Sequence, residues 1–335
     1  MNRRNCFDTA RHIAALMVLF SHHFALSGLP EPYIFNFESI AGIAVIVFFS
    51  ISGFLIAKSA MNSSDFIDFM SKRIKRIFPA LVPCSIFMFI ILGCILSEDV
   101  HSVFSFSTLH NIIKTIALSA PAADGFSDKF IHSGINGSLW TLPLEFFCYL
   151  ITGYIVATWK KPEFFTVVFI IMIFSSVIFM MNGVKITIFS VPLWLFFLRA
   201  SSFFFGSVLA LNYDKWKNTK VSLFIVFALS IYTLASYGNG IEYAISGYLL
   251  ISFMTILICT SIDDFVVKGR FDYSYGIYIY AFPVQQLVIN YFNVGFYTGM
   301  LISIILTLAL AMLSWHFIEK KSLSHKSKKL LLKKV

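Results

Sequence analysis

The sequence predicts an all-α, polytopic membrane protein with about ten transmembrane helices and both termini in the cytoplasm. Of its 335 residues, 58% are hydrophobic and only 13% are charged. A soluble domain carries about 25% charged residues, so a soluble enzyme of this length would have too little polar surface to cover its core. The same composition excludes a disordered chain, a collagen-like chain and a disulfide scaffold.

Apolar stretches of about 20 residues, the length that crosses about 30 Å of hydrocarbon as a helix, recur along the chain. They cover residues 10–27, 40–58, 77–96, 139–158, 164–181, 187–211, 221–237, 243–260, 274–291 and 298–318. The long connection 97–138 is predicted to be a loop with one short surface helix at 109–118, and loops of this length usually serve a function.

Basic residues predict the orientation of these spans. If the N-terminus is cytoplasmic, inner segments hold 22 Lys and Arg residues, whereas outer segments hold only Lys114, Lys129 and Lys185. Such asymmetry is typical of cytoplasmic loops. The net charge of +9 is therefore a consequence of topology and indicates no nucleic-acid partner. We expect residues 1–320 to form the membrane domain and residues 321–335 a basic cytoplasmic tail on anionic lipid.

Cysteine and histidine spacings support neither an outer disulfide nor a metal site. The five cysteines all fall in predicted spans or on the inner side. We therefore predict no metal cofactor.

Ionisable residues inside spans are few, and each costs about 2.5 to 3.5 kcal/mol to insert. His22 lies eleven residues after Arg11, roughly 16 Å further outward on a helix. Glu145 lies in the fourth predicted span, which enters the membrane from the outer side. Its depth below the outer surface is roughly 10 Å, similar to that of His22. A carboxylate holding this imidazole would fix its tautomer and raise its basicity, as general-base catalysis requires. The alternative is that His22 is a hydrogen-bonded packing residue, and neighbouring His23 points about 100° away.

Arg199 lies within the sixth predicted span and cannot lose its proton. It must therefore face a partner or a wet cavity. A structural ion pair with Glu145 and a role at the reacting centre are both open.

A cationic cluster directly precedes the third span and consists of Lys72, Arg73, Lys75 and Arg76. Positive-inside bias, with lipid headgroups as partners, accounts for many such clusters. A sharper hypothesis is a site for a phosphorylated cytoplasmic ligand, because Arg73 and Arg76 would share one helix face and offer bidentate donors to phosphate.

Several strings occur together in a characteristic order. They are Arg11 followed by His22, FFSISGFLI at 48–56, RIKRIFP at 73–79, SLWTLPLE at 138–145 and DYSYGIY at 272–278. Over nearly the whole chain this set closely resembles the acyltransferase 3 family of membrane-bound acyltransferases. In length and in segment 275–286 the chain is similar to bacterial O-antigen O-acetyltransferases.

The resemblance implies a stand-alone, ten-helix enzyme of the bacterial inner membrane. Such an enzyme takes acetyl from cytoplasmic acetyl-CoA and passes it to a sugar hydroxyl of a surface polysaccharide, or of its lipid-linked precursor, at the outer face. It also implies that Arg11, His22, Arg73 and Arg76 are functional, and the SLWTLPLE string adds Trp140 and Glu145.

This chain departs from the family pattern in three places. It reads Asp8-Thr9-Ala10-Arg11-His12 where many members have Asp-Gly-x-Arg-Gly, Ala281 stands where many members have a histidine, and Glu319-Lys320-Lys321 replaces Glu-x-Pro. Because of these departures, the motifs do not identify the subfamily or the acceptor, but the expected reaction class is unchanged.

The mechanism we expect divides the work between the two faces of the membrane. Arg73 and Arg76, aided by Lys72 and Lys75, would bind the phosphates of acetyl-CoA. At the other end His22 would act as general base or briefly hold the acetyl, with Glu145 and Arg11 as its catalytic partners. The residues expected to contact substrate or the oxyanion are Arg199, Ser52, Trp140 and Tyr275. The competing hypothesis is a glycolipid transporter or flippase, in which the same buried groups would line a translocation route.

Overall fold

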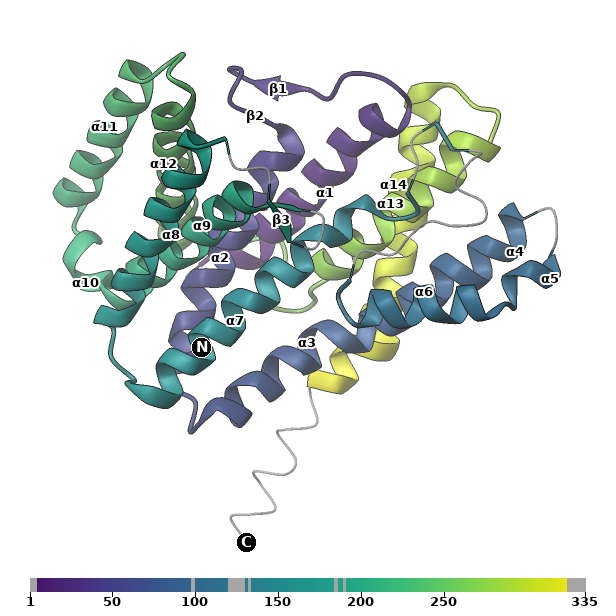
Figure 1. The fold of residues 1–335 in the computed structure, drawn as a ribbon, viewed down its shortest axis with the longest axis horizontal. Coiled ribbons are helices and arrows are strands. Elements are labelled where there is room, and N and C mark those ends of the chain that lie inside the picture. The colour runs from purple at the N-terminus through teal and green to yellow at the C-terminus, as the bar shows by residue number, and fades with distance from the viewer. Residues whose placement is uncertain are drawn as a thin grey trace, which may run out of the picture. The chain divides into compact units, whose positions relative to one another are not determined.

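The computed structural model describes residues 5–97, 100–119, 130–131, 134–183, 186–188 and 191–323, and they form a helical protein (Figure 1). The α-helices are α1 (Phe7–Leu26), α2 (Ile40–Met61), α3 (Phe66–Ile86), α4 (Leu92–Leu96), α5 (Val100–Val103), α6 (Phe106–Ile116), α7 (Thr141–Thr158), α8 (Glu163–Met181), α9 (Leu193–Leu211), α10 (Tyr213–Trp216), α11 (Thr219–Ala235), α12 (Gly240–Ser261), α13 (Ser274–Tyr291) and α14 (Phe296–Ser314). A 3₁₀ turn (η3, Gly137–Trp140) precedes α7, and π-helical turns occur at η1 (Phe87–Ile91) and η4 (Trp315–Glu319).

Each predicted apolar stretch coincides with a helical segment. Within the described residues, seven segments are long and apolar enough to cross a membrane: 40–61, 66–96, 137–158, 163–181, 193–211, 240–261 and 296–323. Helix α11 is apolar but shorter, and α1 and α13 are not among the seven. Most of α13 is buried in protein, so its polar residues do not face lipid. The protein is therefore a helical, multi-pass membrane protein.

Two predicted boundaries were wrong. The third span begins at Phe66 instead of residue 77, so the cationic cluster lies on α3 itself. The sixth begins at Leu193, because residues 187–192 contain the short antiparallel pair β3 (Thr187–Ile188) and β4 (Val191–Pro192). Pro192 lacks a backbone N–H and stands where the helix begins. The predicted surface helix is present as α6, whereas residues 324–335 of the predicted tail lie outside the described residues.

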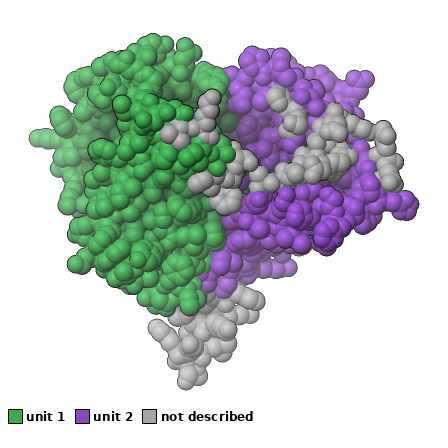
Figure 2. All heavy atoms as spheres, viewed as in Figure 1, with its two compact units in different colours: residues 1–14, 33–70, 141–270 green, residues 15–32, 71–140, 271–335 purple. Residues whose placement is uncertain are grey.

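The chain divides into two compact units that interleave along the sequence (Figure 2). The first comprises residues 1–14, 33–70 and 141–270, and the second comprises residues 15–32, 71–140 and 271–335.

The first unit is built on the close pair α2 and α9. A Cβ atom added at Gly53 would lie 1.7 Å from the carbonyl oxygen of Phe203, and one at Gly206 would lie 2.2 Å from that of Ser50. The Ser207 hydroxyl also donates to the Gly53 carbonyl at 3.1 Å. Small residues permit this backbone approach, which is how membrane helices gain packing energy in the absence of a hydrophobic driving force.

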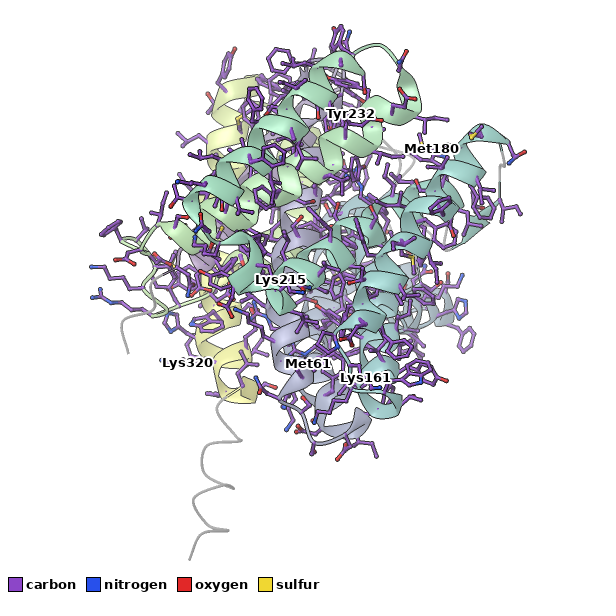
Figure 3. The ribbon with its side chains drawn as sticks, turned by 90° about the vertical axis from the view of Figure 1, so that its left-hand side faces the viewer. Met61, Lys161, Met180, Lys215, Tyr232 and Lys320 are labelled. Atoms are coloured by element: carbon purple, nitrogen blue, oxygen red, sulfur yellow. The ribbon has the colours of Figure 1, made fainter. Side chains whose placement is uncertain are left out.

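The helices of the first unit alternate in direction. Met61 and Lys161 lie at one end of this unit, and Met180 and Tyr232 lie at the other (Figure 3). At the first of these ends, Lys160 donates to the Ser63 carbonyl. Lys217, which donates to the Ser261 hydroxyl, follows Lys215, and Lys215 lies between the two ends in this view (Figure 3). The cationic connection between α7 and α8 therefore lies at the same end as Met61, the last residue of α2 (Figure 3).

The first unit also contains the hairpin of β1 (Tyr33–Ile34) and β2 (Glu38–Ser39), in which Tyr33 pairs with Ser39 and Ile34 with Glu38. Phe35 and Asn36 in its turn both have positive φ. The Ser39 hydroxyl then accepts from the Gly42 N–H and caps α2. The hairpin thus places Glu38 just before the first turn of α2.

In the second unit, prolines within helices free carbonyl groups for tertiary contacts. Pro79 cannot donate to the Lys75 carbonyl, which instead accepts a hydrogen bond from the Ser322 hydroxyl at 3.2 Å. Pro283 likewise frees the Ile279 carbonyl in α13. Backbone carbonyls that lack a helical donor can therefore accept hydrogen bonds from side chains of neighbouring segments.

The orientation of α6 is the reverse of that in a water-soluble protein. Its apolar residues Phe106, Leu109 and Ile113 are exposed, whereas Asn111 and Thr115 are buried. A helix with this arrangement is stabilised when its outer face contacts lipid.

Candidate active site

His22 lies near the C-terminal end of α1, in the part of that helix that belongs to the second unit. It contacts two other residues of the same unit. Its Nδ1 atom lies 3.3 Å from the hydroxyl oxygen of Ser138 in η3. Its ring meets that of Phe282 edge to face, with centroids 5.5 Å apart and an interplanar angle of 77°. Neither the His22 ring nor the Ser138 hydroxyl has a further hydrogen bond among the described residues. The Nε2 atom of His22 is therefore available to a substrate.

Ser138 itself is held through its main chain. Its N–H donates to the Asn136 side-chain oxygen at 3.2 Å, and its carbonyl accepts from the Tyr278 hydroxyl at 2.5 Å. The Asn136 amide donates in turn to the Ile279 carbonyl at 2.8 Å, the group that Pro283 leaves unbonded. The carbonyl that Pro283 leaves without its helical donor thus helps to fix the serine that contacts the imidazole.

The neighbouring His23 has a different environment. Its Nε2 lies 3.1 Å from the Phe296 carbonyl, and its Nδ1 lies 3.4 Å from the amide nitrogen of Gln285. With both ring nitrogens partnered and the side chain buried, His23 is a packing residue. The sequence had placed it as the weaker candidate.

Two carboxylates bear on the prediction for His22. Glu31 belongs to the same unit, accepts a hydrogen bond from the Ser21 hydroxyl at 2.6 Å, and exerts its charge on His22. Glu145 belongs to the first unit, where it accepts hydrogen bonds from Ser52 and Tyr149, each at 2.6 Å. The pairing of Glu145 with His22 stays a prediction.

Arg199 has a definite partner, and the predicted alternative of an ion pair with Glu145 is wrong. Arg199 donates to the Glu38 carboxylate at 3.1 Å and to the Gly42 carbonyl at 3.0 Å. The Tyr248 hydroxyl donates to the same Glu38 oxygen at 2.8 Å, and the guanidinium lies 5.0 Å from the Tyr248 ring centroid. Glu38 was missed because the hairpin that positions it has no strong sequence signal. An oxyanion role for Arg199 is untested.

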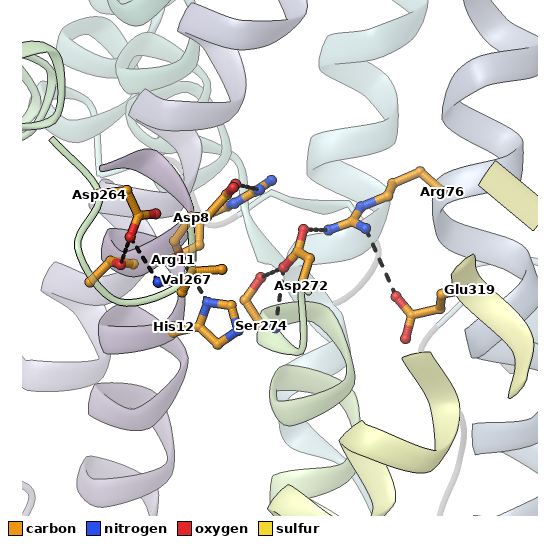
Figure 4. Close-up of polar contacts among 10 residues, drawn as sticks. Asp8, Arg11, His12, Arg76, Asp264, Val267, Asp272, Ser274 and Glu319 are labelled. Carbon is orange, nitrogen blue, oxygen red and sulfur yellow. Dashed lines mark hydrogen bonds and ion pairs between the residues drawn. The ribbon is translucent and has the colours of Figure 1, made fainter. Parts of the chain in front are cut away.

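The cationic cluster of α3 is partly neutralised within its own unit. Arg76 forms an ion pair with Asp272 at 2.5 Å and lies 3.9 Å from Glu319, on either side of its guanidinium (Figure 4). The Ser274 hydroxyl donates to Asp272 and the Ser314 hydroxyl to Glu319. Arg76 therefore shares its charge with two buried carboxylates.

The other cations of the cluster differ in exposure: Lys75 is exposed, whereas Lys72 and Arg73 are half-buried. Nearby, the Tyr275 hydroxyl donates to the Ile77 carbonyl and ties α13 to α3. That contact gives Tyr275 a structural role, which leaves its predicted substrate role untested. Trp140 closes η3 and is half-buried.

Arg11 belongs to the first unit and pairs with Asp8 one turn earlier on α1, at 2.6 Å (Figure 4). Beside it, Thr9 donates to Asp264 at 2.8 Å. Burial alone raises the pKa of Asp264, but hydrogen bonds from Thr9 and from following backbone N–H groups outweigh burial and lower it.

No group of three or more metal-ligating side chains occurs among the residues that the structure describes.

Comparison with known proteins shows the family of this chain. A model of the acyltransferase 3 family, described as an acyltransferase domain, matches residues 4–316. The O-acetyl transferase of Shigella phage Sf6 is 54% identical over 333 residues, which cover 99% of this chain and 100% of that protein. Nodulation protein 10 of Rhizobium leguminosarum bv. viciae is 27% identical over 352 residues, covering 96% and 93%. No solved structure matches. The chain belongs to the acyltransferase 3 family and is an acyltransferase.

Proposed function

We propose that this protein transfers acetyl from cytoplasmic acetyl-CoA to a sugar hydroxyl of a surface polysaccharide or its lipid-linked precursor. The acceptor is of the O-antigen type and is modified at the outer face of the bacterial inner membrane. The observation that carries the proposal is an imidazole with one partnered and one available nitrogen, in a chain that is 54% identical to an O-acetyl transferase. A glycolipid transporter has no comparable support.

A ten-span topology with cytoplasmic termini is supported by the distribution of charge within each unit. In the first unit Lys160 and Lys161 lie at the end where α2 finishes (Figure 3), and in the second the cationic cluster of Lys72, Arg73, Lys75 and Arg76 lies in the first half of α3. Cytoplasmic loops collect basic residues in this way. We therefore assign these ends to the cytoplasm and the C-terminal end of α1 to the outer side.

The reaction needs one base and no metal. The Nε2 atom of His22 takes the proton of the sugar hydroxyl as its oxygen bonds to the thioester carbonyl carbon. The carbon–sulfur bond then breaks, and the CoA thiolate leaves and takes up the proton from the imidazolium. The sugar ester and free CoA are the products. Glu145 and Arg11 keep their predicted catalytic roles as part of this proposal, and Ser52, Arg199, Trp140 and Tyr275 keep theirs toward substrate or oxyanion.

Acetyl-CoA carries its phosphates at one end of a long flexible arm. That end suits the cationic cluster of Lys72, Arg73, Lys75 and Arg76, which we call the inner mouth. We assign the phosphates to Arg73, Lys72 and Lys75, with a smaller direct share for Arg76 because two carboxylates already offset its charge. Arg76 would chiefly stabilise the structure of the inner mouth through its ion pairs with Asp272 and Glu319.

Labelled acetyl-CoA tests the proposal directly. The purified protein in lipid nanodiscs is incubated with it and with surface polysaccharide from which ester-linked acetyl has been removed by mild alkali. We expect label in the polysaccharide with the natural chain and none with His22→Ala, and both proteins should share the same thermal midpoint. Transfer by the His22→Ala variant would exclude it as the base.

The phosphate assignment is tested separately. Arg73→Ala should raise KM for acetyl-CoA about tenfold, the loss of one charge-assisted phosphate contact. Arg76→Ala should mainly lower the thermal midpoint. An unchanged KM in Arg73→Ala would count against the cationic mouth.

A further inference from the structure

The hydrogen bonds around His22 leave one question open, namely which group keeps its ring in the tautomer that general-base catalysis needs. A neutral imidazole accepts a proton at one nitrogen only if the other carries the hydrogen. In His22 the partnered nitrogen is Nδ1, and the hydroxyl oxygen of Ser138 is its hydrogen-bonding neighbour at 3.3 Å.

We propose that Ser138 is a positioning residue for His22: its hydroxyl oxygen accepts a hydrogen bond from Nδ1–H and so directs the Nε2 lone pair toward the sugar hydroxyl. The inference rests on the proposed function, because it assigns a partner to the base of that reaction. It also names a residue for which the sequence motif alone indicates no role.

A serine oxygen can serve both charge states of the ring. When Nε2 takes the substrate proton, the imidazolium has two N–H donors, so the group at Nδ1 must accept in the neutral and in the charged state. A hydroxyl does this without moving, since its own hydrogen rotates away. A group that could only donate would oppose protonation.

Ser138 is rigid enough for this role. It is 1% exposed, and both its N–H and its carbonyl are bonded, to Asn136 and Tyr278 respectively. Catalytic groups are held in place by such supporting hydrogen bonds. His22 is half-buried, and its Nε2 atom has no hydrogen-bond partner among the described residues.

A second contact fixes the plane of the ring. Phe282 meets His22 edge to face and also lies against Gly137, where an added Cβ would come within 2.8 Å of the Phe282 ring. The 3₁₀ turn therefore supplies two adjacent residues with complementary effects. Ser138 holds the Nδ1 edge, and Gly137 leaves room for the ring that packs on the face.

Steady-state kinetics of Ser138→Ala test the proposal. We expect kcat for acetyl transfer to fall about 10 to 100-fold, because part of the general-base contribution is lost. KM for acetyl-CoA should stay within about twofold, since the inner mouth is unchanged. Ser138→Thr retains the hydroxyl and should recover much of kcat, whereas Ser138→Cys, similar in size but a weak acceptor, should not.

Ser85→Ala is the matched control, because Ser85 is equally buried in the same unit and donates only to the Val82 carbonyl. It should leave kcat unchanged. Thermal midpoints of all variants separate misfolding from loss of positioning, and Tyr278→Phe, which removes one support of Ser138, should lower kcat less than Ser138→Ala does.

Three results would overturn the inference. They are an unchanged kcat in folded Ser138→Ala, an equal loss in Ser138→Thr and Ser138→Ala when both are folded, or acetyl bound covalently to Ser138 by mass spectrometry. The last would make the serine a nucleophile instead of a positioning group. If the natural chain itself transfers no acetyl, it is the proposed function that fails, so the two failures are distinguishable.

Discussion

Replacing Arg199 with methionine separates a structural from a catalytic role for this residue. The substitution removes the hydrogen bonds to Glu38 and to the Gly42 carbonyl and the contact with the Tyr248 ring. Among the described residues, it leaves the Glu38 carboxylate with the Tyr248 hydroxyl as its remaining partner. Breaking a fully buried ion pair costs about 3 to 5 kcal/mol. Because the Glu38 side chain is 22% exposed, water offsets part of that cost, and we expect about 2 to 4 kcal/mol.

The assay is thermal unfolding of the nanodisc-bound protein, followed by tryptophan fluorescence. A loss of this size corresponds to a fall in midpoint of about 4 to 12 °C. Glu38→Gln should lower the midpoint as well, and the double variant should lose less than the sum by about 1 to 3 kcal/mol, the coupling of the pair. Lys220→Met, which removes an exposed cation of the same unit, is the control.

A normal midpoint combined with lost acetyl transfer would refute this reasoning about Arg199. The guanidinium would then act on substrate or on the oxyanion, as the sequence had left open. An absence of coupling between Arg199 and Glu38 in the double variant would equally remove the ion pair as the cause of any instability.

Two further variants test the close contact between α2 and α9 and the hydrogen bonds to Asp264. Gly53→Ala places a Cβ 1.7 Å from the Phe203 carbonyl oxygen and should cost about 1 to 3 kcal/mol in thermal unfolding, whereas Gly240→Ala, with open space around it, should cost little. Equal midpoints for the two variants would contradict the close helix contact. The lowered pKa of Asp264 means that its stabilising contribution is present above the unfolded value of about 3.9 and is lost as pH falls through the folded value. Asp264→Asn should therefore lower stability at neutral pH and flatten the acid limb of the stability profile, and an unchanged acid limb would count against this assignment.

Much of the fold is predictable from the sequence, because the length of apolar runs reports directly on the bilayer. The errors are local and have local causes. Residues 187–192 are apolar enough to extend a span, but apolarity does not distinguish strand from helix over so few residues. At α3 the opposite error arose, because a helix that leaves the apolar layer continues through charged residues such as Lys72.

The site was only partly predictable, since motifs identify residue types but not partners. His22 and Arg76 were identified from their strings, whereas their described partners Ser138, Asp272 and Glu319 lie more than a hundred residues away along the chain. Depth along a helix suggested Glu145 as partner for both His22 and Arg199. Depth places two groups at one level of the membrane but leaves their direction around the helix axis undetermined.

The prolines of the second unit connect these observations. A polar side chain inside an apolar helix bundle needs a hydrogen-bonding partner, and backbone carbonyls are the most abundant acceptors, but an intact helix uses nearly all of them internally. Pro283 releases the carbonyl of Ile279, which binds Asn136, and Asn136 in turn holds the serine beside His22. Pro283→Ala should therefore stabilise α13 and yet lower kcat, because the restored internal bond competes with Asn136. If Pro283→Ala gains stability and its acetyl transfer is undiminished, the free Ile279 carbonyl does not contribute to positioning His22.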